Sequence, residues 1–109
     1  MDLFEALADP TRRAIVEILA DGERSAGHIS DRFDIAGPSV SRHLKVLRES
    51  GLVAVRKDAQ SRIYQLRPEP LDEVRAWMQA RLDRLHSRFD ALGAHLDQMK
   101  AREEQHGEG

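Results

Sequence analysis

Apolar positions at the start of the chain predict two helices of different length. Residues 3–8 form an apolar run of about two turns, the length of a short helix. Asp9 then provides an N-cap candidate and Pro10 a proline suited to the first helical position. Ile15 and Leu19, four positions apart, fall on one face of the helix that would follow. The pattern therefore predicts a short helix followed closely by a longer amphipathic one.

Two more helices are predicted before residue 52. Ser25 is a candidate N-cap for a helix of about two turns. After a break at residues 35–37, a second helix is expected from Pro38 to Ser50, with Gly51 ending it as the residue after the C-cap. Its buried face has spacings of four and three and consists of Val40, Leu44 and Leu47.

The hydrophobic period then changes from that of helices to that of strands. Residues 52–56 and 62–66 are rich in β-branched and aromatic side chains, and residues 57–61 would form the turn between them. Pro68 and Pro70 close the second strand. Four helices, a two-stranded hairpin and a final helix make a mainly α winged helix-turn-helix fold.

A long C-terminal helix is expected from Leu71 to about residue 104, followed by a disordered tail at 105–109. It carries an apolar stripe with alternating spacings of four and three: Met78, Leu82, Leu85, Phe89, Leu92, Leu96 and Met99. At about 1.5 Å per residue the helix would be about 50 Å long, more than so small a domain can cover. We therefore expect residues 1–70 to form a DNA-binding domain and residues 71–104 to serve as a dimerisation helix of the same domain.

The residues that flank this stripe do not by themselves fix how two such helices pair. With Leu82 and Leu85 at heptad positions a and d, Arg81, Arg88, His95 and Arg102 occupy g, and Gln79, His86, Gly93 and Lys100 occupy e. A parallel pair would face like charges across the seam, and an antiparallel pair, which brings g against g and e against e, is no better. We expect the long helix to pack into a multi-helix dimer core, in which the first helix takes part, and not to form a free two-stranded coiled coil. Its predicted interface residues are Leu3, Phe4, Leu7, Met78, Leu82, Leu85, Phe89, Leu92 and Leu96.

Composition narrows the functional class. The 109 residues amount to one domain, and without cysteine there is no disulfide, thiolate ligand or thiol nucleophile. The sequence has no glycine-rich phosphate loop and no evident nucleophile–base pair, which argues against an enzyme and a cofactor. It also has no apolar run of about 18 residues and no signal-peptide pattern, so a cytoplasmic protein is expected.

Charge is distributed unevenly along the chain. The net charge is −2, yet residues 38–62 contain six basic and two acidic side chains. On the helix expected from Pro38, the side opposite the buried face carries Ser41, Arg42 and Lys45. Hydroxyl and helix N-terminal N–H groups bind phosphate, and an arginine can contact guanine O6 and N7 together. This face therefore predicts contact with duplex DNA in the major groove, and the charged hairpin tip predicts a second contact.

Two stretches, FEALADPTRR at 4–13 and SVSRHLKVLRESGLV at 39–53, resemble the ArsR-type winged-helix repressors. The resemblance covers about residues 1–85 and implies a homodimer that binds an inverted-repeat operator and blocks transcription. It places Ser39, Ser41, Arg42 and His43 at base-contacting positions, and helical spacing places Lys45 on the same face. The alternative for His43 is a half-buried helix residue bonded to a carbonyl. The resemblance places Lys57, Gln60, Ser61 and Arg62 in the wing.

The thiolate metal site of many members is missing. Its ligand positions fall here on Ser25 and Gly27, which are not soft-metal ligands, and Val74 stands where an Asp–His site would need histidine. His86 and Asp90 lie at i and i+4 on the long helix, and together with His95 they could form a zinc site shared across a dimer. We nevertheless predict no metal site. There are two alternative functions. One is a sensor that responds to a metal or a small molecule, and the other is a winged helix used for protein–protein contact. The sequence identifies no effector.

Overall fold

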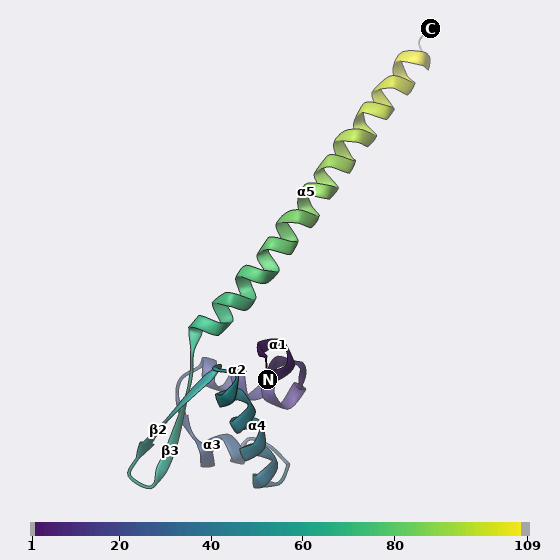
Figure 1. Ribbon diagram of the computed structural model, residues 1–109. Helices are drawn as coiled ribbons and strands as arrows, with labels where there is room; N and C mark the ends of the chain where they lie inside the picture. Colours follow the sequence, from purple (N-terminus) through teal and green to yellow (C-terminus); the bar gives the residue numbers. More distant parts are fainter. Residues whose placement is uncertain (1, 108–109) are drawn as a thin grey trace. The chain divides into compact units, whose positions relative to one another are not determined.

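The computed structural model describes the backbone of residues 2–107 and the side chains of residues 2–104. It divides into two compact units, Met1–Val74 and Arg75–Gly109. The elements, labelled in Figure 1, are α1 (Leu3–Ala8), α2 (Pro10–Ala20), β1 (Arg24–Ser25), α3 (Ala26–Asp31), α4 (Gly37–Glu49), β2 (Val53–Asp58), β3 (Ser61–Leu66) and α5 (Pro68–Gly107). The predicted class, a winged helix-turn-helix with a long C-terminal helix, is confirmed.

Side-chain caps fix the starts of the first three helices. Asp2 Oδ1 accepts a hydrogen bond from the Glu5 N–H at 2.8 Å, and Ser25 Oγ accepts one from the His28 N–H at 3.1 Å. Asp9 caps α2 as predicted, with Pro10 in the first turn. Helix α4 begins at Gly37, one residue earlier than predicted, and its N-cap Ala36 makes no side-chain cap bond.

The end of α4 is a Schellman motif. Ser50 is the C-cap, and Gly51 follows with φ of 83°, a left-handed conformation that glycine adopts without steric cost. The Gly51 N–H donates to the Arg48 carbonyl and the Leu52 N–H to the Leu47 carbonyl, both at 3.0 Å. Leu47 and Leu52 are both fully buried, as the motif's hydrophobic contact requires. The chain therefore turns sharply from α4 into β2.

The sheet has three strands, in the order β1-β3-β2, where the sequence predicted a two-stranded hairpin. The β2–β3 register runs from Val53↔Leu66 to Asp58↔Ser61, so the loop contains two residues, not five. The missed strand β1 pairs antiparallel with β3, Arg24 opposite Tyr64. Two residues are too few to show a period of two, and this is why the pattern did not predict β1.

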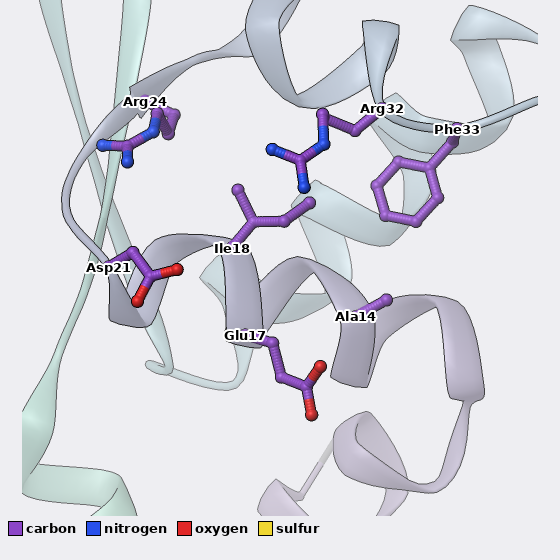
Figure 2. A pocket seen from close by; sticks show the side chains of 7 residues that line it. All are labelled: Ala14, Glu17, Ile18, Asp21, Arg24, Arg32 and Phe33. Atoms are coloured by element: carbon purple, nitrogen blue, oxygen red, sulfur yellow. The ribbon is translucent and has the colours of Figure 1, made fainter.

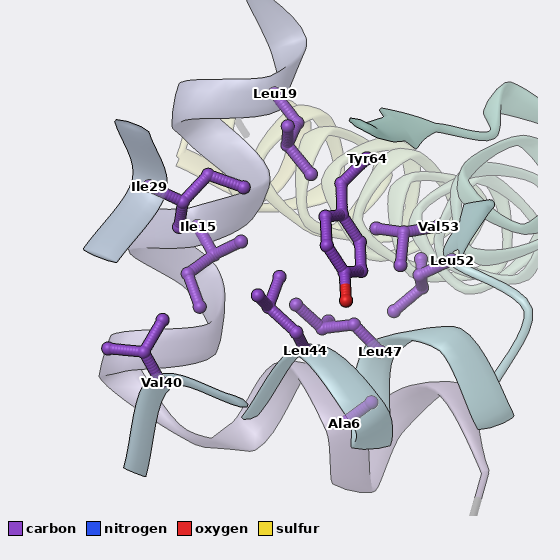
Figure 3. Close-up of a cluster of buried hydrophobic side chains, with 10 residues drawn as sticks. All are labelled: Ala6, Ile15, Leu19, Ile29, Val40, Leu44, Leu47, Leu52, Val53 and Tyr64. Carbon is purple, nitrogen blue, oxygen red and sulfur yellow. The ribbon is translucent and has the colours of Figure 1, made fainter. Parts of the chain in front are cut away.

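The core of the first unit is one cluster of ten buried hydrophobic residues drawn from α1, α2, α3, α4 and the hairpin. They are Ala6, Ile15, Leu19, Ile29, Val40, Leu44, Leu47, Leu52, Val53 and Tyr64. In Figure 3 the side chains from α2 and α4 point toward one another, with Tyr64 of β3 beside them. The predicted buried face of α4 is therefore confirmed, and it fixes which face of this helix is exposed.

Helix α5 runs from Pro68 to Gly107, three residues beyond the predicted span at each end. The prolines taken as strand terminators lie in its first turn, where a missing N–H costs no helical hydrogen bond. Of the predicted tail 105–109, residues 108 and 109 lie outside the described residues. The α5 stripe, defined as the seven apolar residues Met78, Leu82, Leu85, Phe89, Leu92, Leu96 and Met99, is 43% to 60% exposed. In the part of the chain that is described, no helix combines the length and apolar character needed to cross a membrane.

Candidate nucleic-acid interface

The exposed face of α4 carries the side chains predicted to reach base edges. Ser41, Arg42 and Lys45 are exposed, on the side opposite the buried Val40 and Leu44. The contacts of the two cations are loose: Arg42 Nη2 lies 3.4 Å from Ser39 Oγ, and Lys45 Nζ lies 3.9 Å from the Glu49 carboxylate. Exposed pairs of this kind contribute little stability, so these side chains can exchange their contacts for DNA at small cost.

His43 lies on the flank of this face and is oriented by α2. Its side chain is 22% exposed, and its Nδ1 lies 3.4 Å from Arg12 Nη1 and 3.9 Å from Asp9 Oδ1. The His43 ring, which was predicted to contact a base, therefore points its Nδ1 toward the start of α2. A neighbouring residue holds this ring in place before any DNA is bound.

Arg12, which the sequence analysis did not single out, links three helices. Its Nε donates to the Ala6 carbonyl at 2.7 Å and its Nη2 to the Glu5 carbonyl at 2.9 Å, while Nη1 meets His43. The guanidinium thus satisfies carbonyls of α1 that have no helical partner and also touches α4. The signal that could have identified it is an arginine just after an N-cap, beside a helix only six residues long.

Asp9 completes this junction. Its Oδ1 accepts from the Thr11 N–H at 2.8 Å and the Arg12 N–H at 3.1 Å. The Arg12 N–H lowers the pKa of the Asp9 carboxyl most, partial burial opposes that effect, and the nearby His43 lowers the pKa further. The carboxylate therefore stays charged where it caps α2 and faces His43.

The wing presents four exposed polar side chains that were predicted from the sequence: Lys57, Gln60, Ser61 and Arg62. Lys57 and Arg62 are directly opposite each other on β2 and β3. Like charges at such a cross-strand pair destabilise a hairpin, and an anion beside them would remove the penalty. The pairing therefore favours a phosphate contact at this point of the wing.

A basic hollow joins α4 to the wing. Lys45, Arg48 and Arg62 line it, together with Ser41 and Tyr64. Arg48 and Arg62 also line a neighbouring hollow, with Arg56 and Lys57. Arg48 and Arg56 were missing from the predicted site, because sequence alone does not show that they meet across two elements. Arg56 is paired with Glu23 at 2.5 Å, which leaves Arg48 as the added cation more available to a phosphate.

A second hollow lies between α2 and the end of α3 (Figure 2). Arg32 extends over Ile18, and Glu17 points to the other side of α2. Two acidic and two basic side chains line the hollow, so it has no net preference for an ion. Its lining residues are Ala14, Glu17, Ile18, Asp21, Arg24, Arg32 and Phe33. Among the described residues, no three His, Cys, Asp or Glu side chains lie close enough to hold a metal ion.

Comparison with known proteins gives consistent matches over this unit. A family model described as a helix-turn-helix domain matches residues 7–56. The transcriptional repressor SdpR of Bacillus subtilis is 35% identical over 77 residues, covering 71% of this chain and 86% of that protein. The HTH-type transcriptional regulator Rv2034 of Mycobacterium tuberculosis is 46% identical over 72 residues, covering 66% of this chain and 67% of its own length.

Solved structures agree with these relatives. The crystal structure of an ArsR family transcriptional regulator, 34% identical, matches with a TM-score of 0.72 over 77% of this chain and 87% of that one. A second, of a possible transcriptional regulator for arsenical resistance, is 38% identical, with a TM-score of 0.69 over 80% of this chain and 95% of its own. With the exposed α4 face and the basic wing beside it, these likenesses identify a DNA-binding transcription regulator and not an enzyme, and the chain belongs to the ArsR-type family of winged helix-turn-helix regulators.

Proposed function

We propose that this protein is a homodimeric, cytoplasmic repressor that binds an inverted-repeat operator. The observation that carries the proposal is the exposed face of α4 together with two basic hollows, which share Arg48 and Arg62 and extend to the wing. A repressor needs only to occupy its operator, and such a surface supplies affinity for duplex DNA without any catalytic group. The name of the relative SdpR supports repression, whereas another relative, HlyU of Vibrio cholerae, is named an activator.

Within each half-site, α4 enters the major groove. Arg42 reaches guanine O6 and N7, and Ser41 and Lys45 lie on the same exposed face to contact neighbouring bases or phosphates. Ser39, itself at a base-contacting position, lies beside Arg42 from one turn earlier on the helix, and Arg12 orients His43. The reading residues are therefore positioned partly by their neighbours, one of which, Arg12, belongs to α2.

The wing and its hollow bind the phosphate backbone. Lys57 and Arg62 contact a phosphate or the minor groove, with Gln60 and Ser61 as hydrogen-bonding partners at the tip. Arg48 adds a third cation between the wing and α4. Contacts to phosphate carry no sequence information, so this part of the surface sets affinity and orientation.

Two copies are required to read an inverted repeat. Residues 1–70 form the DNA-binding part and residues 71–104 the dimerisation helix, with the α5 stripe as the main contact. In α1, Phe4 is 48% exposed and is the strongest candidate for the dimer, because Leu3 and Leu7 pack against the core of their own unit.

The test is binding to the DNA upstream of the gene, with half-sites mapped by footprinting. We expect Arg42→Ala to cost about 1–3 kcal/mol of binding free energy, while Arg84→Ala, which removes the same charge from α5, leaves binding nearly unchanged. Affinity should fall steeply with salt, since phosphate contacts release counterions. A flat salt response and an unaffected Arg42→Ala variant would instead indicate a winged helix used for protein contact.

A further inference from the structure

The contact between Arg12 and His43 bears on where the His43 ring carries its proton. A neutral imidazole has one N–H, on either Nδ1 or Nε2, and its other nitrogen accepts hydrogen bonds. The nitrogen of His43 that faces α2 is Nδ1, 3.4 Å from Arg12 Nη1. A guanidinium has only N–H donors and stays protonated in proteins. It therefore stabilises an Nδ1 that carries a lone pair and destabilises an Nδ1 that carries a proton.

The Arg12 guanidinium is held in the position that this contact needs. Its Nε donates to the Ala6 carbonyl at 2.7 Å, and its Nη2 donates to the Glu5 carbonyl at 2.9 Å. Both acceptors belong to α1, so the planar group is fixed at two of its three nitrogens before it meets α4. The remaining nitrogen, Nη1, is thereby directed toward the His43 ring. The donor is set by α1 and needs no bound ligand to hold it.

Asp9 is the rival partner for the same ring nitrogen, because its carboxylate would favour a proton on Nδ1. Its Oδ1 lies 3.9 Å from His43 Nδ1, which is beyond hydrogen-bonding distance. The same oxygen already accepts the Thr11 N–H at 2.8 Å and the Arg12 N–H at 3.1 Å. The Arg12 Nη1 is the nearer group, at 3.4 Å. The distances therefore favour an unprotonated Nδ1.

The second ring nitrogen of His43, Nε2, is open to solvent. Among the described residues, none forms a hydrogen bond with Nε2, and no buried side-chain nitrogen or oxygen is left without a partner. An atom of this half-buried residue that has no partner must therefore reach the surface. His43 also lines a hollow with Ser39 and Arg42, which were both predicted to contact bases. The ring thus has one edge fixed by α2 and a free nitrogen for an outside partner.

We propose that Arg12 fixes His43 as the tautomer with its proton on Nε2, so that His43 offers DNA a hydrogen-bond donor and no acceptor. The proposal rests on the DNA-binding role proposed above for α4 and adds which base groups His43 can read. In the major groove, guanine O6 and N7, adenine N7 and thymine O4 accept hydrogen bonds, whereas cytosine presents an N4 amino donor. His43 therefore selects against cytosine at the position it contacts. Arg12 acts through His43 and is a positioning residue.

The first test is the nitrogen NMR spectrum of the histidine rings in the full-length protein without DNA. At about pH 8, above the usual histidine pKa, protonated and unprotonated ring nitrogens give separate signals. The His43→Gln variant identifies the His43 signals among those of the five histidines. We expect a proton on Nε2 and none on Nδ1. A proton on Nδ1, on both nitrogens, or exchanging equally between them would overturn the proposal and leave the DNA-binding role of α4 intact.

Two neighbouring arginines give a variant and its matched control. Arg12→Met removes the donor to His43. Arg13 also donates to carbonyls of α1, those of Leu7 at 2.8 Å and Ala8 at 3.0 Å, so Arg13→Met loses comparable bonds to α1. We expect Arg12→Met to give a mixture of the two tautomers and Arg13→Met to keep the native spectrum. A native spectrum in both folded variants would overturn the role of Arg12. The spectrum of the unsubstituted protein remains decisive even if Arg12→Met does not fold.

The second test measures base preference on duplexes that carry the footprinted half-site, with each base pair under α4 changed in turn. Glutamine both donates and accepts, so His43→Gln can pair with either kind of group. At one position we expect the native protein to bind cytosine about twofold to tenfold less tightly than the best base, and His43→Gln to lose that preference. If the substitution changes preference at no position, the reading role of His43 is wrong. If the native protein binds no upstream duplex, the proposed function itself is wrong.

Discussion

The two units of this protein use hydrophobic residues in opposite ways. In Met1–Val74, ten hydrophobic side chains are buried against one another, supplied by four helices and a hairpin. In Arg75–Gly109, the seven residues of the α5 stripe are as apolar, yet each is 43% or more exposed. Between residues 75 and 104 no described residue is buried.

This difference assigns the two units different sources of stability. Burying a leucine or isoleucine side chain contributes about 1.5–3 kcal/mol, so the first unit gains its stability from its own sequence. A single helix in water has no such gain and depends on propensity and on whatever covers its apolar face. The first unit therefore has a hydrophobic core of its own, whereas the apolar face of α5 needs a partner to cover it.

The largest expected effect comes from comparing the same substitution, leucine to alanine, in each of the two units. Leu47→Ala removes a fully buried side chain and should lower the free energy of unfolding by about 2–5 kcal/mol. Leu85→Ala should change the unfolding of the monomer by less than about 0.5 kcal/mol and should weaken self-association instead. Denaturant melts at several protein concentrations measure both. If both variants lost a similar free energy of unfolding in dilute, monomeric protein, α5 would have to pack on its own chain. The difference drawn between the two units would then be wrong.

A smaller effect is expected at the Asp9 cap, which belongs to the first unit. Asp9→Ala should cost about 1 kcal/mol of stability at pH 7, since two backbone N–H groups lose their acceptor. The pKa of Asp9 is lowered in the folded state, so its charge stabilises the fold above the unfolded pKa of about 3.9. That contribution is lost as the pH falls through the folded pKa.

The corresponding measurement is a pair of denaturant melts at each pH. The stability gap between the native chain and Asp9→Ala should be constant above about pH 5 and narrow below pH 4. Asp9→Asn, which keeps a capping oxygen but no charge, is the control and should retain most of the stability at neutral pH. A gap that widens toward low pH would contradict the role assigned to the carboxylate.

The smallest effects come from exchanging alanine and glycine in opposite directions. Ala59, in the two-residue wing loop, has φ of 56°, a left-handed conformation that costs alanine about 1 kcal/mol. Ala59→Gly should therefore stabilise the first unit by about 0.5–1 kcal/mol. Gly93 lies inside α5 with open space around it, so Gly93→Ala should raise helicity by a similar free energy.

Thermal melts followed by circular dichroism distinguish the two exchanges. The gain from Ala59→Gly belongs to the unit with the sheet, and that from Gly93→Ala to the helix. A loss of stability in Ala59→Gly would mean that the loop does not need its left-handed residue.

Periodic features could be predicted from the sequence, and single-residue features could not. The spacing of Val40, Leu44 and Leu47 predicted both the core face of α4 and its exposed face, because one face of a helix fixes the other. Asp9 and Ser25 were recognised as caps from their positions before apolar runs. Each of these signals is local in the chain.

What was missed depends on residues far apart in sequence. Arg24 joins the sheet only because Tyr64 lies beside it, and Arg12 orients His43 across 31 positions. The same holds for Arg48, whose place beside Arg62 depends on the turn that follows α4. The predicted DNA-contacting residues are brought to one surface, but their phosphate-binding neighbours could be identified only once the hairpin had been placed.

The Schellman motif at Gly51 has a consequence for how this protein could be altered. Backbone hydrogen bonds to the Leu47 and Arg48 carbonyls set the corner between the helix and the wing, and no exposed side chain of α4 takes part. Ser41, Arg42 and Lys45 can therefore be varied while the scaffold stays the same. Base preference and thermal robustness become separately adjustable properties, and a library at these three positions would alter the first while leaving the second nearly constant.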